Sequence, residues 1–149
     1  MFVRVAGAGL IIILMGTMPQ VASAQISALE VMKAAAVCVA LEEARGNQVL
    51  LVQIDVATKG FTRSQTLTLQ AGSKYRIYAI GDGNRIVDID LSVDDADGNE
   101  VGKDNDFTNV AIVEVRVAKT QRYTLKAHPF RLKDGIKDGF FAFIIVRID

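Results

Sequence analysis

From residue 48 onward apolar and polar side chains alternate, and this two-residue period constrains the fold more than any other feature. The alternation is clearest in the segment Ile86–Asp94. Because side chains of a strand point to opposite faces in turn, one face of this segment is expected to lie in a core. The predicted core side chains are Val87, Ile89, Leu91 and Val93, and the polar face carries Asp88, Asp90, Ser92 and Asp94.

Similar runs, separated by turns rich in Gly, Asn and Asp, follow one another to the end of the chain. Short strands without helices between them predict an all-β domain over residues 47–149, an antiparallel β-sandwich of the jelly-roll or immunoglobulin-like kind with about seven to eight strands. The predicted strands are Val49–Val56, Thr66–Leu69, Tyr75–Ile80, Ile86–Val93, Val110–Val117, Tyr123–Ala127 and Phe140–Ile148.

Residues 1–24 have the pattern of an export signal peptide. Arg4 supplies a positive charge, Leu10–Met15 lies in an apolar core, and Ala22-Ser23-Ala24 is a small-residue cleavage pattern. We expect cleavage before Gln25 and an exported protein, periplasmic or secreted. The apolar run is shorter than the roughly 20 residues that a stable membrane span requires.

The segment of residues 25–46 is predicted to be a helix. Ser27 and Glu30 have the spacing of a capping box, and Gly46 provides a C-terminal end. Within Val31–Leu41 only Lys33 interrupts an otherwise apolar surface, so we expect the helix to bury more than one side, against a sheet edge or across an open end of the sandwich. The alternative is that residues 27–45 self-associate or bind a partner.

Charge and cysteine content exclude several functions. Loss of Arg4 with the leader leaves 16 basic and 17 acidic side chains, a balance that gives no electrostatic footprint for nucleic acid. Cys38 is the only cysteine, so an internal disulfide is impossible. Its thiol is expected to be buried, with intermolecular pairing as the alternative.

The stretch between Asp88 and Asp106 contains seven aspartates, one glutamate and one lysine. Carboxylate oxygens are the ligands that calcium prefers, which makes a calcium site one hypothesis. The other is an acidic hairpin that faces water or pairs with Arg85, Lys103 and Arg116, because turns select Asp, Asn and Gly without any metal. The candidate ligands are Asp88, Asp90, Asp97, Asp104 and Asp106.

A series of short motifs begins after Leu67: Leu69–Tyr75, Gly81–Gly83, Asp88–Leu91, Asp95–Asn99 and Arg122–Leu125. Their order resembles the bacterial pre-peptidase C-terminal (PPC) domain, a β-sandwich module found beside secreted proteases and other exported enzymes. The resemblance implies an accessory module without catalytic residues. Some modules of that family bind calcium, which adds to the calcium hypothesis.

The sequence contains little that indicates catalysis. His128 is the only histidine, and no nucleophile lies beside it. Tyr78 and Phe130 are candidate contacts for a partner: Tyr78 has the opposite strand parity to the predicted core residue Tyr75, and Phe130 lies in a predicted loop. Packing in a core or at an edge is the alternative for both rings.

We therefore predict an exported, non-catalytic binding or accessory module for a protein or polysaccharide, with stabilisation by calcium left open. Two alternatives also stay open. One is a structural or assembly subunit that associates through the apolar N-terminal helix, and the other is a hydrolase that uses the Asp cluster.

Overall fold

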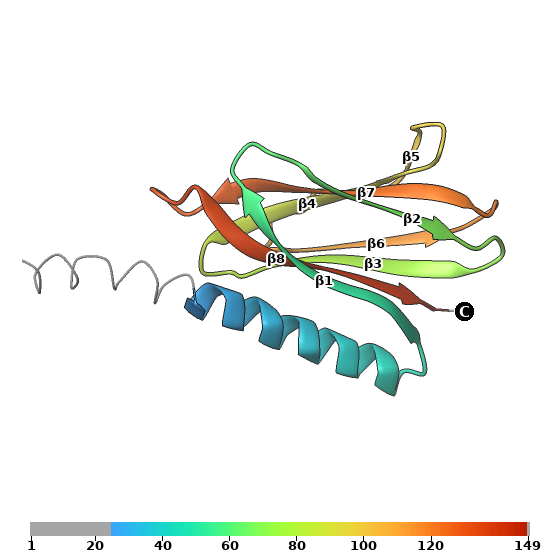
Figure 1. The fold of residues 1–149 in the computed structure, drawn as a ribbon, viewed down its shortest axis with the longest axis horizontal. Coiled ribbons are helices and arrows are strands. Elements are labelled where there is room, and N and C mark those ends of the chain that lie inside the picture. Colours follow the sequence, from blue (N-terminus) through green and yellow to red (C-terminus); the bar gives the residue numbers. More distant parts are fainter. Residues whose placement is uncertain (1–24, 149) are drawn as a thin grey trace, which may run out of the picture.

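The computed structural model describes residues 25–148, in which a helix of residues 25–44 precedes eight strands. The strands form two antiparallel four-stranded sheets, with the orders β1-β8-β3-β6 and β2-β7-β4-β5 (Figure 1). We call them sheet A and sheet B. The strand bounds are β1 Gln48–Thr58, β2 Arg63–Leu69, β3 Lys74–Gly81, β4 Ile86–Asp94, β5 Glu100–Asp104, β6 Val110–Arg116, β7 Gln121–Leu132 and β8 Asp138–Arg147.

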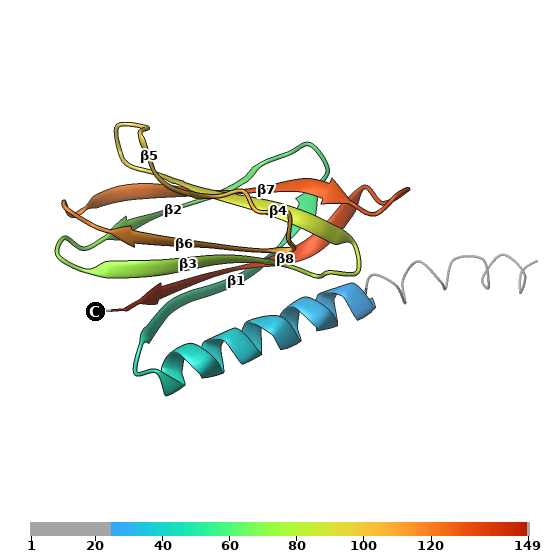
Figure 2. The same cartoon turned by 180° about the vertical axis from the view of Figure 1, so that it is seen from behind.

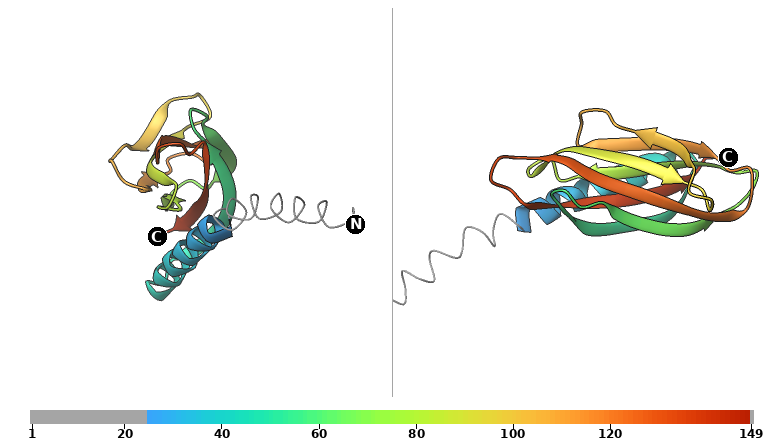
Figure 3. Two further views of the ribbon diagram at one scale, coloured as in Figure 1. Left: turned by 90° about the vertical axis from the view of Figure 1, so that its left-hand side faces the viewer. Right: turned by 90° about the horizontal axis from the view of Figure 1, so that it is seen from above.

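The predicted antiparallel β-sandwich is confirmed, and the two sheets lie face to face with the helix outside them (Figure 3). The strand that the two-residue period did not identify is β5, which has only five residues, three of them charged. The predicted signal peptide lies outside the described residues. Within residues 25–148, no helix combines the length and apolar character that crossing a bilayer requires.

The main core fills the space between the two sheets. Phe141 and Phe143 of β8 lie in it with their ring centroids 5.0 Å apart and their ring planes at 78°. Tyr75 and Ile77 of β3 enter from the same sheet, and residues of β4 and β7 enter from the opposite one. β8 is central in sheet A and is apolar on both faces, as its sequence predicts.

The predicted face of β4 is wrong at its first position. Ile86 is fully buried in the main core, whereas Val87 is only partly buried and does not belong to it. The cause is a break in the pairing of β4 with β7, whose register shifts between Ile86 and Asp88 and again between Asp88 and Asp90. Regular alternation holds from Ile89 to Val93.

The helix covers the outer face of sheet A and forms a second apolar cluster there (Figure 2). Val31 and Ala35 are buried in this cluster, but Met32, Val37 and Leu41 are more than half exposed. The expectation that the helix buries more than one side is therefore wrong, because only one stripe faces the sheet. The sheet contributes Tyr78, Ile80, Ala142, Ile144 and Val146.

Polar contacts join both halves of the helix to the sandwich. The Ser27 hydroxyl donates a hydrogen bond to the carboxylate of Asp82, and both side chains are buried. Ser27 thus connects the helix to the loop between β3 and β4, which differs from the predicted capping role. Near the C-terminal end of the helix, Glu42 is the only charged residue of the helix that is buried.

Candidate functional site

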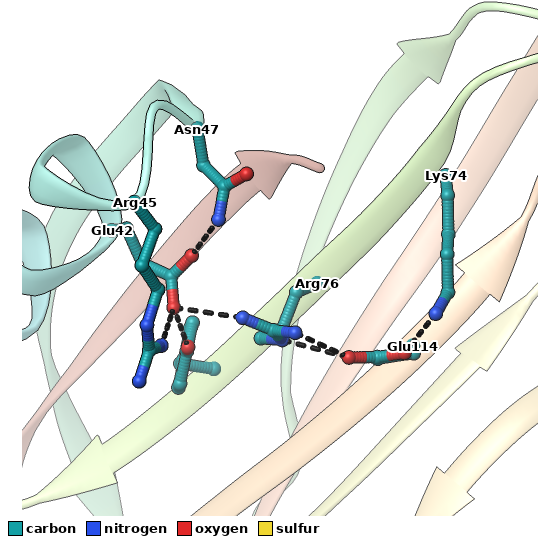
Figure 4. Close-up of polar contacts among 7 residues, drawn as sticks. Glu42, Arg45, Asn47, Lys74, Arg76 and Glu114 are labelled. Atoms are coloured by element: carbon teal, nitrogen blue, oxygen red, sulfur yellow. Dashed lines mark hydrogen bonds and ion pairs between the residues drawn. The ribbon is translucent and has the colours of Figure 1, made fainter. Parts of the chain in front are cut away.

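Glu42 is the centre of a polar cluster between the end of the helix and β3 (Figure 4). Its side chain is 1% exposed and accepts four hydrogen bonds. They come from Arg45 Nη1 at 2.7 Å, Asn47 Nδ2 at 2.6 Å, Arg76 Nη1 at 2.9 Å and the Tyr78 hydroxyl at 2.6 Å. The four donors satisfy a carboxylate that would otherwise be costly to bury.

The helical period explains why this carboxylate is buried. Glu42 lies seven residues after Ala35 and eleven after Val31, so the three side chains share the stripe that faces sheet A. On the sheet, Arg76 and Tyr78 are two residues apart in β3 and therefore point to the same outer face. Helix and strand together place the acceptor opposite its donors.

The cluster continues across sheet A to β6. Arg76 pairs with Glu42 on one side and with Glu114 on the other, where Nη2 lies 2.7 Å from the carboxylate. Lys74 also pairs with Glu114, which is 36% exposed. The five side chains Glu42, Arg45, Lys74, Arg76 and Glu114 thus combine three cations with two carboxylates. The cluster has an excess of positive charge and extends from the buried Glu42 to solvent.

Electrostatics keep the centre of the cluster ionised. Burial by itself raises the pKa of Glu42, but hydrogen bonds from Tyr78, Asn47 and Arg76 outweigh it and lower the pKa to about 2. Burial, together with the hydrogen bond to Glu42, raises the pKa of Tyr78, so its hydroxyl remains a donor. The hydrogen bond to Glu114 raises the pKa of Arg76.

An apolar groove lies beside this cluster, between the helix and β6. Its volume is about 360 Å³. Val37, Leu41 and Ile112 are 59%, 53% and 45% exposed, so much of this aliphatic surface is open to solvent. We call it the helix–β6 groove. Its lining is Ala34, Val37, Cys38, Leu41, Glu42, Arg45, Tyr78, Ile80, Val110 and Ile112.

A charged hollow of about 650 Å³ adjoins the groove at the end of the helix. Arg45, Tyr78 and Ile112 line both spaces, so the apolar groove opens directly onto the charged hollow. Cys38 lies in the apolar part, where burial and the nearby Glu42 raise the pKa of its thiol. The remaining lining of the hollow is Asn47, Lys74, Arg76, Glu114 and Ile148.

The two aromatic residues predicted to contact a partner lie in different environments. Tyr78 points away from the main core, as its strand parity predicts, but it is only 7% exposed because the helix covers it. The prediction of an exposed Tyr78 is therefore wrong. Phe130 in β7 is 58% exposed and lies edge-on to His128, with ring centroids 6.4 Å apart. The predicted loop is wrong, because Phe130 lies within β7, and its binding role stays a prediction.

The aspartates predicted as calcium ligands are spread over three environments. Asp88 is 1% exposed, and burial next to Asp90 raises its pKa. Asp104 accepts hydrogen bonds from the backbone N–H of Ile112 at 2.7 Å and of Asp106 at 3.0 Å, and so fixes β5 to β6. Asp97 and Asp106 are exposed.

The acidic hairpin is held by its own hydrogen bonds. Asp95 accepts bonds from the backbone N–H groups of Asp97 and Asn99, each at 2.9 Å, and Asp94 pairs with Lys126. No three His, Cys, Asp or Glu side chains among the described residues are grouped as a metal ion would require. The calcium site stays a prediction.

Sequence reasoning missed the polar cluster, although two signals were available. Glu42 interrupts an apolar stripe at a position that the helical period directs toward the sheet. Arg76 interrupts the apolar strand that contains Tyr75 and Ile77. A buried charge of each sign, one on a helix and one on a strand, is the pattern of an ion pair between the two elements.

Comparison with known proteins identifies the fold and no family. No protein-family model matches the chain, and no curated protein matches it. The structure is similar to that of Aeromonas hydrophila PliG, a periplasmic lysozyme inhibitor of g-type lysozyme, with a TM-score of 0.50 and 13% sequence identity. The similarity covers 70% of this chain and 90% of that chain.

Proposed function

We propose that this chain is an exported, non-catalytic module that binds a protein partner through the helix–β6 groove. The observation that carries the proposal is the continuity of the groove with the charged hollow through Arg45, Tyr78 and Ile112. A partner segment with aliphatic side chains beside an acidic group complements both parts. The excess of cations in the hollow attracts the acidic group.

The aliphatic lining favours a protein over a polysaccharide. A sugar that entered the apolar part would bury hydroxyl groups without hydrogen-bond partners, at a cost of about 1–3 kcal/mol for each group. Aliphatic side chains of a partner instead gain about 25 cal/mol for each Å² of apolar surface that they bury. Val37 and Leu41 supply the largest exposed apolar surface on the helix side of the groove.

Export and a protein partner have independent support. The pattern of residues 1–24 predicts a signal peptide. The similar fold of PliG belongs to a periplasmic inhibitor, which makes g-type lysozyme the first partner to test. The resemblance to PPC domains favours the same class, an accessory module of the cell envelope or the medium, and it stays a prediction.

The alternative of assembly through the helix is narrowed by the way the helix packs. Val31 and Ala35 are buried against the chain's own sheet, and Ser27 is joined to Asp82. A partner that used this stripe would have to displace the helix. Any association through the helix is therefore expected to use its exposed side.

The test is a peptide-display selection on the immobilised protein, with counter-selection on Leu41→Asp. We expect enriched peptides to combine aliphatic and acidic residues and to lose at least tenfold in affinity for Leu41→Asp and Ile112→Asp. The matched control is Val101→Asp, because Val101 is similarly exposed but lies on β5, away from the groove. Failure to enrich any such peptide, or equal binding by the groove variants, would contradict the proposal.

Lysozyme is tested separately, by calorimetric titration and by residual lytic activity. Binding of g-type lysozyme by the native protein that is weakened at least tenfold by Ile112→Asp would identify both the partner and the surface. Binding that the groove variants leave unchanged would place the contact elsewhere on the molecule.

A further inference from the structure

The sandwich has four edge strands, and three of them are protected against pairing with another chain. β5 has only five residues and carries Glu100, Lys103 and Asp104. β6 has its outward N–H at Ile112 bonded to the Asp104 carboxylate. β2 begins with Arg63, and its other exposed side chains, Ser64, Thr66 and Thr68, are polar. Short length, charge and side-chain capping are the usual means of blocking an edge.

The fourth edge strand, β1, has little of this protection. It is 11 residues long, and Asp55 is its only charged residue. Leu50, Val52 and Ile54 are 43%, 44% and 41% exposed. Val52 and Ile54 lie opposite Ile144 and Ala142 of β8, so their side chains extend the outer face of sheet A beyond the helix-covered cluster.

The hydrogen bonds at Val56 show which backbone groups of β1 point outward. Its N–H donates to the Asp55 carboxylate and its carbonyl accepts from Arg63 Nε, each at 2.7 Å. Backbone groups alternate in direction along an antiparallel strand, and β1 pairs with β8 in unbroken register from Leu51. Val52 and Ile54 therefore also direct N–H and C=O outward, and within residues 25–148 nothing pairs with them.

We propose that the open part of β1 is an interface with a second copy of this chain. Two β1 strands would pair antiparallel about a twofold axis at Gln53, which joins the two copies of sheet A into one sheet. In this register Val52 of each copy faces Ile54 of the other, and both outward pairs exchange two hydrogen bonds. The four aliphatic side chains then pack together on one face.

The charges and the cap at Val56 fit this register. With Gln53 on the axis, Asp55 faces Leu51 of the second copy, so the two carboxylates do not oppose each other. The bonds that Asp55 and Arg63 make to Val56 end the open edge there, which limits the contact to Leu51–Asp55. Such a narrow contact predicts a dimer that dissociates on dilution. The interface is separate from the helix–β6 groove and does not depend on the proposed function.

The first test is the mass of the purified protein by sedimentation velocity over a range of concentrations. We expect a shift from monomer to dimer with concentration, and a monomer at every concentration for Ile54→Lys. Thr66→Lys, an exposed position on the β2 edge, is the control and should dimerise like the native protein. Circular dichroism verifies that each variant is folded, and Ile54→Pro is a second variant that removes an outward N–H without touching the bonds to β8.

The second test is of the register, by oxidative cross-linking in a Cys38→Ser background. Gln53→Cys places two thiols across the axis in a non-hydrogen-bonded pair, where Cα atoms are about 4.5 Å apart and a disulfide can form. Asp55→Cys is the matched control, because the two copies of that position lie roughly 13 Å apart along the strands. We expect a cross-linked dimer only for Gln53→Cys.

Either test can overturn the proposal. A native protein that stays monomeric at the highest concentration, or a folded Ile54→Lys that dimerises as well as the native chain, rules out the β1 interface. Equal cross-linking of Gln53→Cys and Asp55→Cys, or none by Gln53→Cys, rules out this register.

Discussion

The two outer faces of the sandwich differ in what they present to solvent. The outer face of sheet A is largely apolar where the helix covers it, and beside this apolar part Glu42 meets Arg76 and Tyr78 in a polar contact. The outer face of sheet B carries hydroxyl and charged side chains, such as Thr66 and Thr124, whose oxygens are 3.3 Å apart, and Lys126. The two sheets have equal numbers of strands but different surroundings. The outer face of sheet B is solvated, whereas the outer face of sheet A is covered by the helix as a third layer.

Among the changes that test this difference between the faces, removal of the Glu42 carboxylate is expected to lower the free energy of unfolding most. Glu42→Ala leaves Tyr78 and part of Arg76 buried without an acceptor, and we expect the free energy of unfolding to fall by about 3 kcal/mol. Urea denaturation measures it. The control is Glu114→Ala, which removes a half-exposed partner of the same Arg76 and should cost less than about 1 kcal/mol. Equal losses would contradict a special role for the helix contact.

The Glu42 carboxylate should also determine how the free energy of unfolding depends on pH in acid solution. In the fold the pKa of Glu42 is about 2, below its ordinary value of 4.5. Its stabilising contribution is therefore complete above pH 4.5 and is lost as the pH falls toward 2. Glu42→Gln should flatten this part of the profile, whereas exposed Glu43→Gln should leave it unchanged.

A reciprocal pair of substitutions compares the faces directly. Val31→Thr puts a hydroxyl into the fully buried contact of helix and sheet A, and we expect a loss of about 2 kcal/mol. Thr124→Val makes the reverse change on the open face of sheet B and should stay within about 0.5 kcal/mol. Thermal and urea unfolding measure both. A loss of similar size for the two variants would mean that sheet B is also covered in solution.

The alternation of side chains predicted the sandwich because it reports which residues share a face of a strand. It does not report what covers that face. Tyr78 was correctly placed away from the main core, yet its burial depends on the helix, whose position no strand pattern contains. Val87 was misplaced because the register shifts in β4 depend on its pairing with β7. Glu42 was detectable from its position in the apolar stripe, but its four donors come from two separate segments, the turn after the helix and β3.

Asp88 is the exception on sheet B, because it is buried and the nearby charge of Arg131 compensates its burial only in part. Its Oδ1 has no hydrogen-bond partner among the described residues, and burial and Asp90 raise its pKa. The ionised form therefore destabilises the fold as the pH rises through this raised pKa. Asp88→Asn should increase the free energy of unfolding at neutral pH by about 1 kcal/mol, with little gain in acid. Asp97→Asn, at an exposed position in the turn after β4, is the control.

Calcium is expected to change the stability least. Its addition tests whether a bound ion covers part of the outer face of sheet B. Asp95 and Asp104 already accept backbone hydrogen bonds, which they would have to exchange for bonds to the ion. We therefore expect melting temperatures in calcium and in chelator to agree. The opposite result, a stabilisation that grows with calcium concentration and disappears in the double variant Asp88→Asn, Asp90→Asn, would establish the predicted site. It would also mean that a metal ion covers part of sheet B, as the helix covers sheet A.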